Sequence, residues 1–275
     1  MQHRELTTAG VGGINLYAQA WLPGIAPRAV IVVSHGLAEH GGRYETLARE
    51  LVQREYAVYA VDHRGHGRSS GPRANIERFA HLVADFCAFT DRCAGEHPAT
   101  PVFMLGHSMG GAVAFASALR QQHRLQGLVL SAPALATGQA VPRWQEMFVR
   151  LLSLVAPDTG ALTLPPDAVS RDPSVVARYA ADPLVHHKAI PARTLVELLR
   201  AMQGFPASAP GLRLPTLVLH GTADKLVPLA ATQPVYRAFG TRDCVVQLYE
   251  GLYHEVFNEP ERERVTADLL RWLER

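Results

Sequence analysis

Residues 106–110 read Gly-His-Ser-Met-Gly and carry the strongest chemical signal in this chain of 275 residues. The apolar run 101–105 precedes them, and the small-residue helical pattern 111–119 follows at once. A strand that ends in G-x-S-x-G and turns directly into a helix strains the serine backbone and exposes its hydroxyl above the sheet. We therefore predict that Ser108 is a catalytic nucleophile. The alternative is that the glycines only let a helix pack closely on a strand, with the serine as a capping hydroxyl.

A serine hydroxyl is a weak nucleophile at neutral pH, so it needs a histidine base and a carboxylate that fixes the tautomer of that base. One known chain order is serine, acid, histidine, each in a loop after the carboxyl end of a strand. Asp224 ends the turn Gly-Thr-Ala-Asp after the apolar run 216–220, and His254 follows the last apolar run, 245–249. We predict that these two residues complete a triad. The alternatives are a turn-forming aspartate and a polar residue at a helix start.

Acyl transfer passes through a tetrahedral oxyanion, which backbone N–H groups must stabilise. We expect one donor to be the N–H of Met109, directly after the nucleophile, and the other to be the N–H of Leu37, in the loop after the run 29–34. Gly36 allows the backbone to turn there. His107, beside the nucleophile, is expected to line the floor of the pocket.

The remaining histidines and the cysteines do not form a metal site by spacing. His63 and His66 flank a glycine in a loop with no cysteine or carboxylate cluster to complete a ligand set, so we expect no metal and no cofactor. The three cysteines make an odd count without C-x-x-C spacing, which favours a reducing compartment and a cytoplasmic protein.

The charge balance argues against nucleic acid as a partner. The formal net charge is +2, with 27 basic and 25 acidic residues, which is far from the basic excess that phosphate-backbone binding needs. No apolar segment follows the N-terminus, and no run approaches the roughly 18 apolar residues of a spanning helix.

Short apolar runs alternate with helical patterns along most of the chain, which predicts an α/β protein with a mainly parallel sheet covered by helices. Residues 44–54 and 261–273 each place apolar side chains along one helical side. The expected strands are residues 16–21, 29–34, 57–62, 102–105, 128–131, 216–220 and 245–249.

The alternation stops between residues 134 and 206, where prolines cluster and no comparable strand run occurs. We interpret 134–206 as an inserted helical cap (lid) on a core formed by 1–133 and 207–275. Within the cap, residues 147–155 are apolar around most of a helical circumference. This segment either packs on both sides or makes a peripheral contact with a membrane or lipid surface, and the sequence leaves both interpretations open.

Several longer motifs resemble those of the monoacylglycerol lipases, most closely the bacterial members of that family. The E-H-x-x-R-Y element and the Asp-Pro-Leu element inside the cap discriminate better than G-x-S-x-G, and the resemblance spans nearly the whole chain. The matching segments are 35–40 with Arg43 and Tyr44, 62–69, 106–110, 170–173, Tyr179 with 182–184, and 249–254.

The resemblance implies an α/β-hydrolase fold, with a mainly parallel eight-stranded sheet and an inserted helical cap. It also implies the same triad and oxyanion donors. It further suggests that Glu39, Arg43 and Tyr179 form the polar end of the site near a glycerol head group. The alternatives are an ion pair between the first two that fixes a loop, and ordinary cap packing for Tyr179. Phe257 departs from the mammalian pattern, which carries a second histidine there, so selectivity for the alcohol part stays open.

The expected function is therefore a serine hydrolase that cleaves monoacylglycerols to glycerol and a fatty acid through an acyl-enzyme. A broad carboxylesterase or a lysophospholipase would use the same residues, since fold and triad do not determine the substrate. A non-catalytic lipid-binding protein is the remote alternative.

Overall fold

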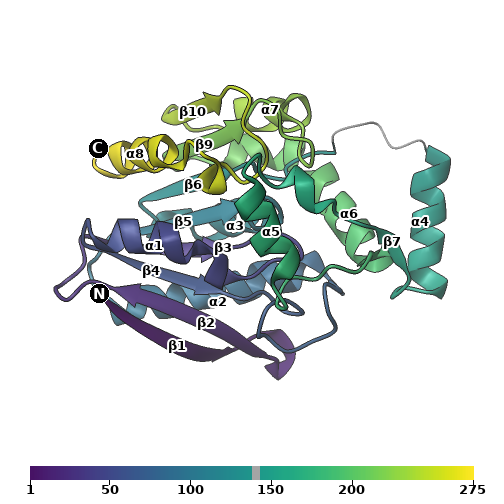
Figure 1. The fold of residues 1–275 in the computed structure, drawn as a ribbon, viewed down its shortest axis with the longest axis horizontal. Helices are drawn as coiled ribbons and strands as arrows, with labels where there is room; N and C mark the ends of the chain where they lie inside the picture. The colour runs from purple at the N-terminus through teal and green to yellow at the C-terminus, as the bar shows by residue number, and fades with distance from the viewer. Residues whose placement is uncertain (138–142) are drawn as a thin grey trace.

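A twisted eight-stranded sheet forms the centre of the molecule in the computed structural model, which describes residues 1–137 and 143–275 (Figure 1). The strand order is β1-β2-β4-β3-β5-β6-β9-β10. All pairs from β4 to β10 are parallel, whereas β2 is antiparallel to both of its neighbours. The strands are β1 (Gln2–Ala9), β2 (Asn15–Leu22), β3 (Ala29–Ser34), β4 (Tyr56–Val61), β5 (Val102–His107), β6 (Gly127–Ser131), β9 (Thr216–Gly221) and β10 (Cys244–Tyr249).

The seven strands expected from the apolar runs all form, with ends within two residues of their predicted positions. The eighth strand, β1, was not recognised from its residues. It lies at the edge of the sheet and pairs only with β2, so its side chains are exposed or half-buried and lack an apolar run. Edge strands commonly have this polar character.

Helices cover both faces of the sheet and create two separate cores. In β3, Val30 and Val32 pack on the side of α2 and α3, whereas Ile31 and Val33 pack on the side of α1 and α8. Burial on both faces explains why these strands are apolar throughout. The helices of the core are α1 (Glu45–Val52), α2 (Phe79–Glu96), α3 (Met109–Gln121), α7 (Leu229–Arg237) and α8 (Arg262–Leu273). Short 3-10 segments occupy Val11–Gly13, Gly41–Tyr44, Gln122–Arg124, Pro166–Ala168, Ala209–Gly211 and Val256–Asn258.

The segment between β6 and β9 forms a separate group of elements beside the carboxyl ends of the central strands (Figure 1). It is mostly helical, and α6 extends through Pro206 beyond the boundary expected at residue 206. It also contains one short antiparallel strand pair that the apolar pattern did not indicate. The elements are α4 (Arg143–Val155), β7 (Gly160–Leu162), α5 (Pro173–Ala181), β8 (Ile190–Pro191) and α6 (Ala192–Ser208).

Helix α4 stands at the outer end of the molecule and packs on α6 (Figure 1). Val149 and Leu152 on its inner side are half-buried. Its outer side is apolar and faces outward, with Leu154 79 % exposed, so α4 does not pack on both sides within the described part of the chain. The other exposed apolar residues of this face are Met147, Phe148, Leu151 and Val155. Across residues 1–137 and 143–275, no helix combines the length and apolar character needed to cross a bilayer.

Candidate active site

Ser108 occupies the sharp turn between β5 and α3. Its backbone angles are φ 54° and ψ −121°, which lie in a region that L-residues rarely adopt. A Cβ at Gly106 would collide with the carbonyl oxygen of Gly110, and a Cβ at Gly110 would collide with that of Ser34, so both flanking glycines are sterically required. The strand-turn-helix geometry predicted for the nucleophile is therefore present, with the Ser108 side chain at the wall of a cavity.

Asp224 lies in the turn after β9, and backbone N–H groups of that turn bind one of its two carboxylate oxygens. Its Oδ1 accepts the N–H groups of Leu226 at 2.8 Å and Val227 at 2.9 Å, which leaves Oδ2 for His254. Burial alone would raise the pKa of this carboxyl, but His254, His220 and the Val227 amide hold it well below its usual value. Asp224 is therefore ionised, and its Oδ2 faces His254 in the loop after β10.

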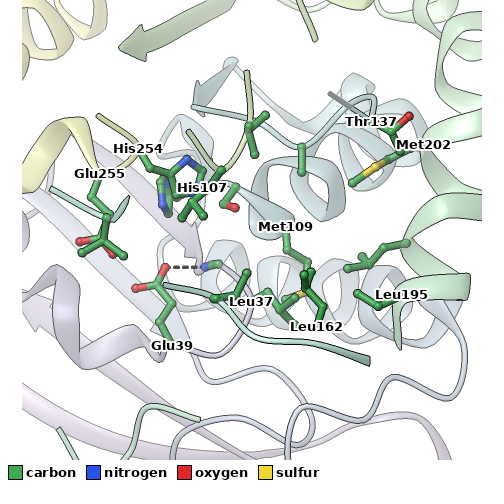
Figure 2. A pocket seen from close by; sticks show the side chains of 18 of the residues that line it. Leu37, Glu39, His107, Met109, Thr137, Leu162, Leu195, Met202, His254 and Glu255 are labelled. Carbon is green, nitrogen blue, oxygen red and sulfur yellow. Dashed lines mark hydrogen bonds between the residues drawn. The ribbon is translucent and has the colours of Figure 1, made fainter. Parts of the chain in front are cut away.

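His254 follows β10, and its Nδ1–H donates to Asp224 Oδ2 over 2.7 Å. That bond places the acceptor of the neutral imidazole at Nε2. The ring of His254 lies 4.6 Å from the ring of His107, and both line the same cavity as Ser108 (Figure 2). No hydrogen bond joins the Ser108 hydroxyl to His254 in the described structure. Such bonds are often long without substrate and tighten in the complex.

Leu37 and Met109 both line this cavity. Neither N–H donates a hydrogen bond to any residue among 1–137 and 143–275. The loop before Leu37 passes close to the nucleophile, since a Cβ on Gly36 would lie 3.3 Å from the Ser108 Cβ. His35 Nδ1–H donates to the Gly36 carbonyl over 2.7 Å, which orients the peptide unit that carries the Leu37 N–H. Two cavity-lining residues thus carry a backbone N–H without a partner in the described structure: one directly follows Ser108 in the chain, and the other directly follows Gly36.

The cavity has a volume of about 360 Å³ and lies between the carboxyl ends of the strands and the segment that joins β6 to β9. Figure 2 shows that its two ends differ: His254, Glu255 and Glu39 lie at one end, and Leu195 and Met202 at the other. The apolar wall comes mainly from the segment between β6 and β9, with Val149, Leu162, Leu164, Val169, Leu195, Leu198, Leu199 and Met202. The site therefore has a polar compartment beside the serine and an apolar compartment leading away from it.

The residues suggested for the polar end divide into two groups. Glu39 and Tyr179 line the cavity, whereas Arg43 lies behind this wall. Its guanidinium pairs with Glu39 at 2.7 Å and with Glu255 at 2.6 Å, and it lies 4.8 Å from the centre of the Tyr179 ring. For Arg43 this geometry matches the alternative of an ion pair that fixes a loop.

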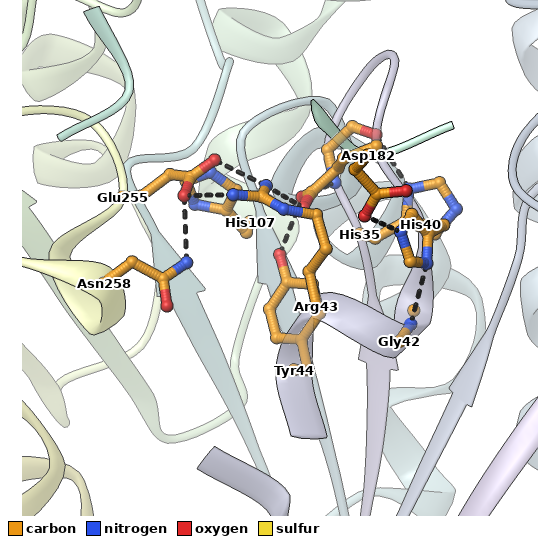
Figure 3. A network of polar contacts seen from close by, with 12 residues as sticks. His35, His40, Gly42, Arg43, Tyr44, His107, Asp182, Glu255 and Asn258 are labelled. Carbon is orange, nitrogen blue, oxygen red and sulfur yellow. Dashed lines mark hydrogen bonds and ion pairs between the residues drawn. The ribbon is translucent and has the colours of Figure 1, made fainter. Parts of the chain in front are cut away.

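Glu255, which was not predicted from the sequence, lines the cavity and binds Arg43 (Figure 3). Its position directly after the predicted base was a signal that it belongs to the site. No pattern could pair it with an arginine 212 positions away.

His35, in the loop after β3, forms a buried cluster with His63 and His66. His63 Nε2 hydrogen-bonds with Ser34 at 2.8 Å, and the backbone N–H of His63 donates to His35 Nε2 at 2.9 Å. Burial holds the pKa of His35 and His63 well below the usual value and lowers the pKa of His66 to about 4, so all three are neutral. In the parts of the chain that the structure describes, no group of histidine, cysteine and acidic side chains has metal-binding geometry.

Comparison with known proteins agrees with this geometry. The family model described as serine aminopeptidase, S33 (Hydrolase_4) matches residues 25–261. A monoacylglycerol lipase of Mycolicibacterium smegmatis is 41 % identical over 98 % of this chain and 96 % of its own length. The human monoglyceride lipase is 34 % identical over 90 % of this chain and 82 % of its own length. Among solved structures, the monoacylglycerol lipase of Paleococcus ferrophilus has a TM-score of 0.82 and 30 % identity, covering 94 % of this chain and 98 % of that one. The chain therefore belongs to the Hydrolase_4 family of α/β-hydrolases, together with these monoacylglycerol lipases.

Proposed function

We propose that this protein hydrolyses monoacylglycerols to glycerol and a free fatty acid, with Ser108, Asp224 and His254 as its triad. Ser108 attacks the ester carbonyl while His254 Nε2 takes the hydroxyl proton, and the amides of Leu37 and Met109 bind the oxyanion. His254 then protonates the departing glycerol oxygen. Water then attacks the acyl carbonyl while His254 takes its proton. The bond between the acyl group and Ser108 Oγ breaks, His254 returns the proton to Ser108, and the fatty acid leaves.

The observation that carries the proposal is the position of a strained Ser108 in one cavity with a histidine whose other nitrogen is bound to a buried carboxylate. This arrangement matches the serine, base and orienting acid of known acyl-transfer sites. The apolar compartment provides a place for one acyl chain, and each methylene buried there contributes roughly 0.8 kcal/mol to binding.

The polar compartment supports a small hydroxylated leaving group. Glu39 and Tyr179 offer hydrogen-bonding atoms there, and His107 forms part of its floor beside His254. Phe257 packs with the core on the α1 and α8 side and does not line the main cavity.

The cap, residues 134–206 with the helical extension to Ser208, is proposed as the part that approaches lipid. The exposed apolar side of α4 lies on the same helix as Val149, whose side chain lines the cavity. A monoacylglycerol leaving a lipid surface at α4 would therefore enter the site directly. Three free cysteines are consistent with work in the cytoplasm.

The test compares purified wild type with Ser108→Ala on monoacyl, diacyl and triacyl glycerols and on a lysophospholipid. We expect the highest kcat/KM for the monoacylglycerol, loss of turnover in Ser108→Ala, and labelling of wild type alone by a fluorophosphonate. Turnover by Ser108→Ala near the wild-type rate would refute the nucleophile. Preference for the lysophospholipid would refute the substrate, and absence of labelling would favour a lipid-binding protein.

A further inference from the structure

The proposed oxyanion donor Leu37 and the proposed base His254 lie in loops that follow two strands which are not neighbours in the sheet. The first loop follows β3 and the second follows β10. In the sheet, β5, β6 and β9 separate these two strands. The distance between the two loops is therefore set by the sheet only indirectly, because three strands lie between β3 and β10.

Arg43 forms a direct link between the loops (Figure 3). Its guanidinium donates to both oxygens of Glu255, from Nη1 to Oε1 over 2.6 Å and from Nη2 to Oε2 over 2.7 Å. The same Nη1 donates to Glu39 Oε2 over 2.7 Å. Glu39 Oε1 accepts the backbone N–H of Gly36 over 2.6 Å, and Glu255 directly follows His254 in the chain. A continuous series of hydrogen bonds thus connects the oxyanion loop to the loop of the base.

This series is shielded from solvent, with side-chain exposures of 5 % for Glu39, 11 % for Arg43 and 6 % for Glu255. Further donors fix both carboxylates, since Tyr44 Oη donates to Glu39 over 2.9 Å and Asn258 Nδ2 donates to Glu255 over 2.9 Å. Burial alone would lower the pKa of Arg43, but the two carboxylates hold it well above its usual value. A forked pair of charge-assisted bonds in a dry site restricts orientation more strongly than an exposed ion pair.

We propose that Glu255 is a positioning residue, which acts through Arg43 to hold the loop of His254 in register with the oxyanion loop. The inference rests on the proposed function, because it presumes that His254 is the base and that the Leu37 amide binds the oxyanion. The alignment matters most when the tetrahedral intermediate forms, since the base and the oxyanion donors must then both be in place.

Glu255→Gln removes the charge but keeps the length of the side chain, so the Arg43 fork is broken with little change in packing. A displacement of about 1 Å at a reacting group lowers turnover about 100-fold. We therefore expect kcat on a monoacylglycerol to fall about 10- to 100-fold, with KM within about threefold of wild type. The rate of fluorophosphonate labelling, which requires the serine, the base and the oxyanion donors but no glycerol group, falls in parallel.

A double-mutant cycle separates this role from an independent one. If Glu255 acts through Arg43, then Glu255→Gln in an Arg43→Met background lowers kcat by less than threefold further. Glu45→Gln serves as a matched control, because it neutralises an exposed glutamate paired with Arg49 on α1, and it should keep wild-type kcat. Should Glu255→Gln not fold, Asn258→Ala weakens the hold on Glu255 and leaves the ion pair in place, and kcat should fall several-fold.

The outcomes distinguish a failure of the proposed function from a failure of the positioning role of Glu255. If wild type does not hydrolyse monoacylglycerol and is not labelled, the proposed function itself is wrong. If wild type is active and Glu255→Gln keeps kcat and the labelling rate within twofold, only the positioning role is overturned. A rise in KM with unchanged kcat and labelling would also overturn it, because Glu255 would then contact the glycerol group directly. Multiplicative effects in the double mutant would refute action through Arg43.

Discussion

Replacing Asp224 by asparagine provides a sharp test of the proposed triad, because the structure determines which way the new amide must point. Asp224 Oδ1 accepts two backbone N–H groups, from Leu226 and Val227. Asparagine can satisfy both only with its carbonyl oxygen, so its NH₂ group must occupy the position of Oδ2, 2.7 Å from His254 Nδ1. The flipped amide would point its NH₂ at two N–H donors and is therefore disfavoured.

The fixed amide forces the wrong tautomer on the base. An NH₂ group donates to His254 Nδ1, so the neutral imidazole carries its proton on Nε2 and cannot accept the Ser108 proton. The imidazolium that forms during attack also loses its buried carboxylate. Serine hydrolases altered in this way lose about 10⁴-fold in kcat, or about 5.5 kcal/mol of transition-state stabilisation. We expect Asp224→Asn to lose activity to that degree while keeping its fold.

The assay measures kcat at pH 7 with a dispersed monoacylglycerol, together with circular dichroism to confirm folding. Asp243→Asn is the matched control, since it makes the same chemical change at an exposed aspartate near Arg275 and should keep wild-type activity. If folded Asp224→Asn retained kcat within tenfold of wild type, the tautomer argument and the assignment of the acid would both be refuted.

Three other predictions concern stability, chain length and lipid contact. Burial lowers the pKa of His66 and of His107 to about 4 from a usual value of 6.5. Between pH 6.5 and 4 the unfolded chain thus binds more protons than the folded chain. As the pH is lowered through that range, the free energy of unfolding, measured in urea, should fall by up to about 3 kcal/mol for each histidine. A free energy of unfolding that does not change with pH would contradict this prediction. Met202→Trp fills the apolar end of the cavity. For long-chain esters, kcat/KM should fall about fourfold for each methylene that no longer fits in the cavity, whereas kcat/KM for short esters should stay the same. An unchanged dependence of kcat/KM on chain length would show that the acyl chain lies elsewhere. Leu154→Glu places a charge on the exposed side of α4 and should weaken vesicle binding without changing hydrolysis of a soluble ester; equal vesicle binding would remove α4 from the lipid contact.

Much of the fold could be predicted because its strands are buried on both faces. A doubly buried strand must be apolar at every position, and such runs stand out in the sequence, as in β3 and β5. The edge strand β1 was not predicted because it pairs with a neighbour on one side only and none of its residues is fully buried, so it has no apolar run. The pair β7–β8 was missed for a similar reason, since elements of two or three residues carry no periodicity.

The residues alone predicted a serine hydrolase, from a serine in a G-x-S-x-G turn followed by an acid and a histidine after later strands. These signals are local, because each depends on a turn of a few residues at the end of a strand. Three features became visible only in the folded molecule: Arg43 lies behind the cavity, Glu255 pairs with it, and α4 leaves an apolar side uncovered. The pairing of Arg43 with Glu255 depends on two loops brought together by the order of strands in the sheet, and no spacing along the chain encodes that distance.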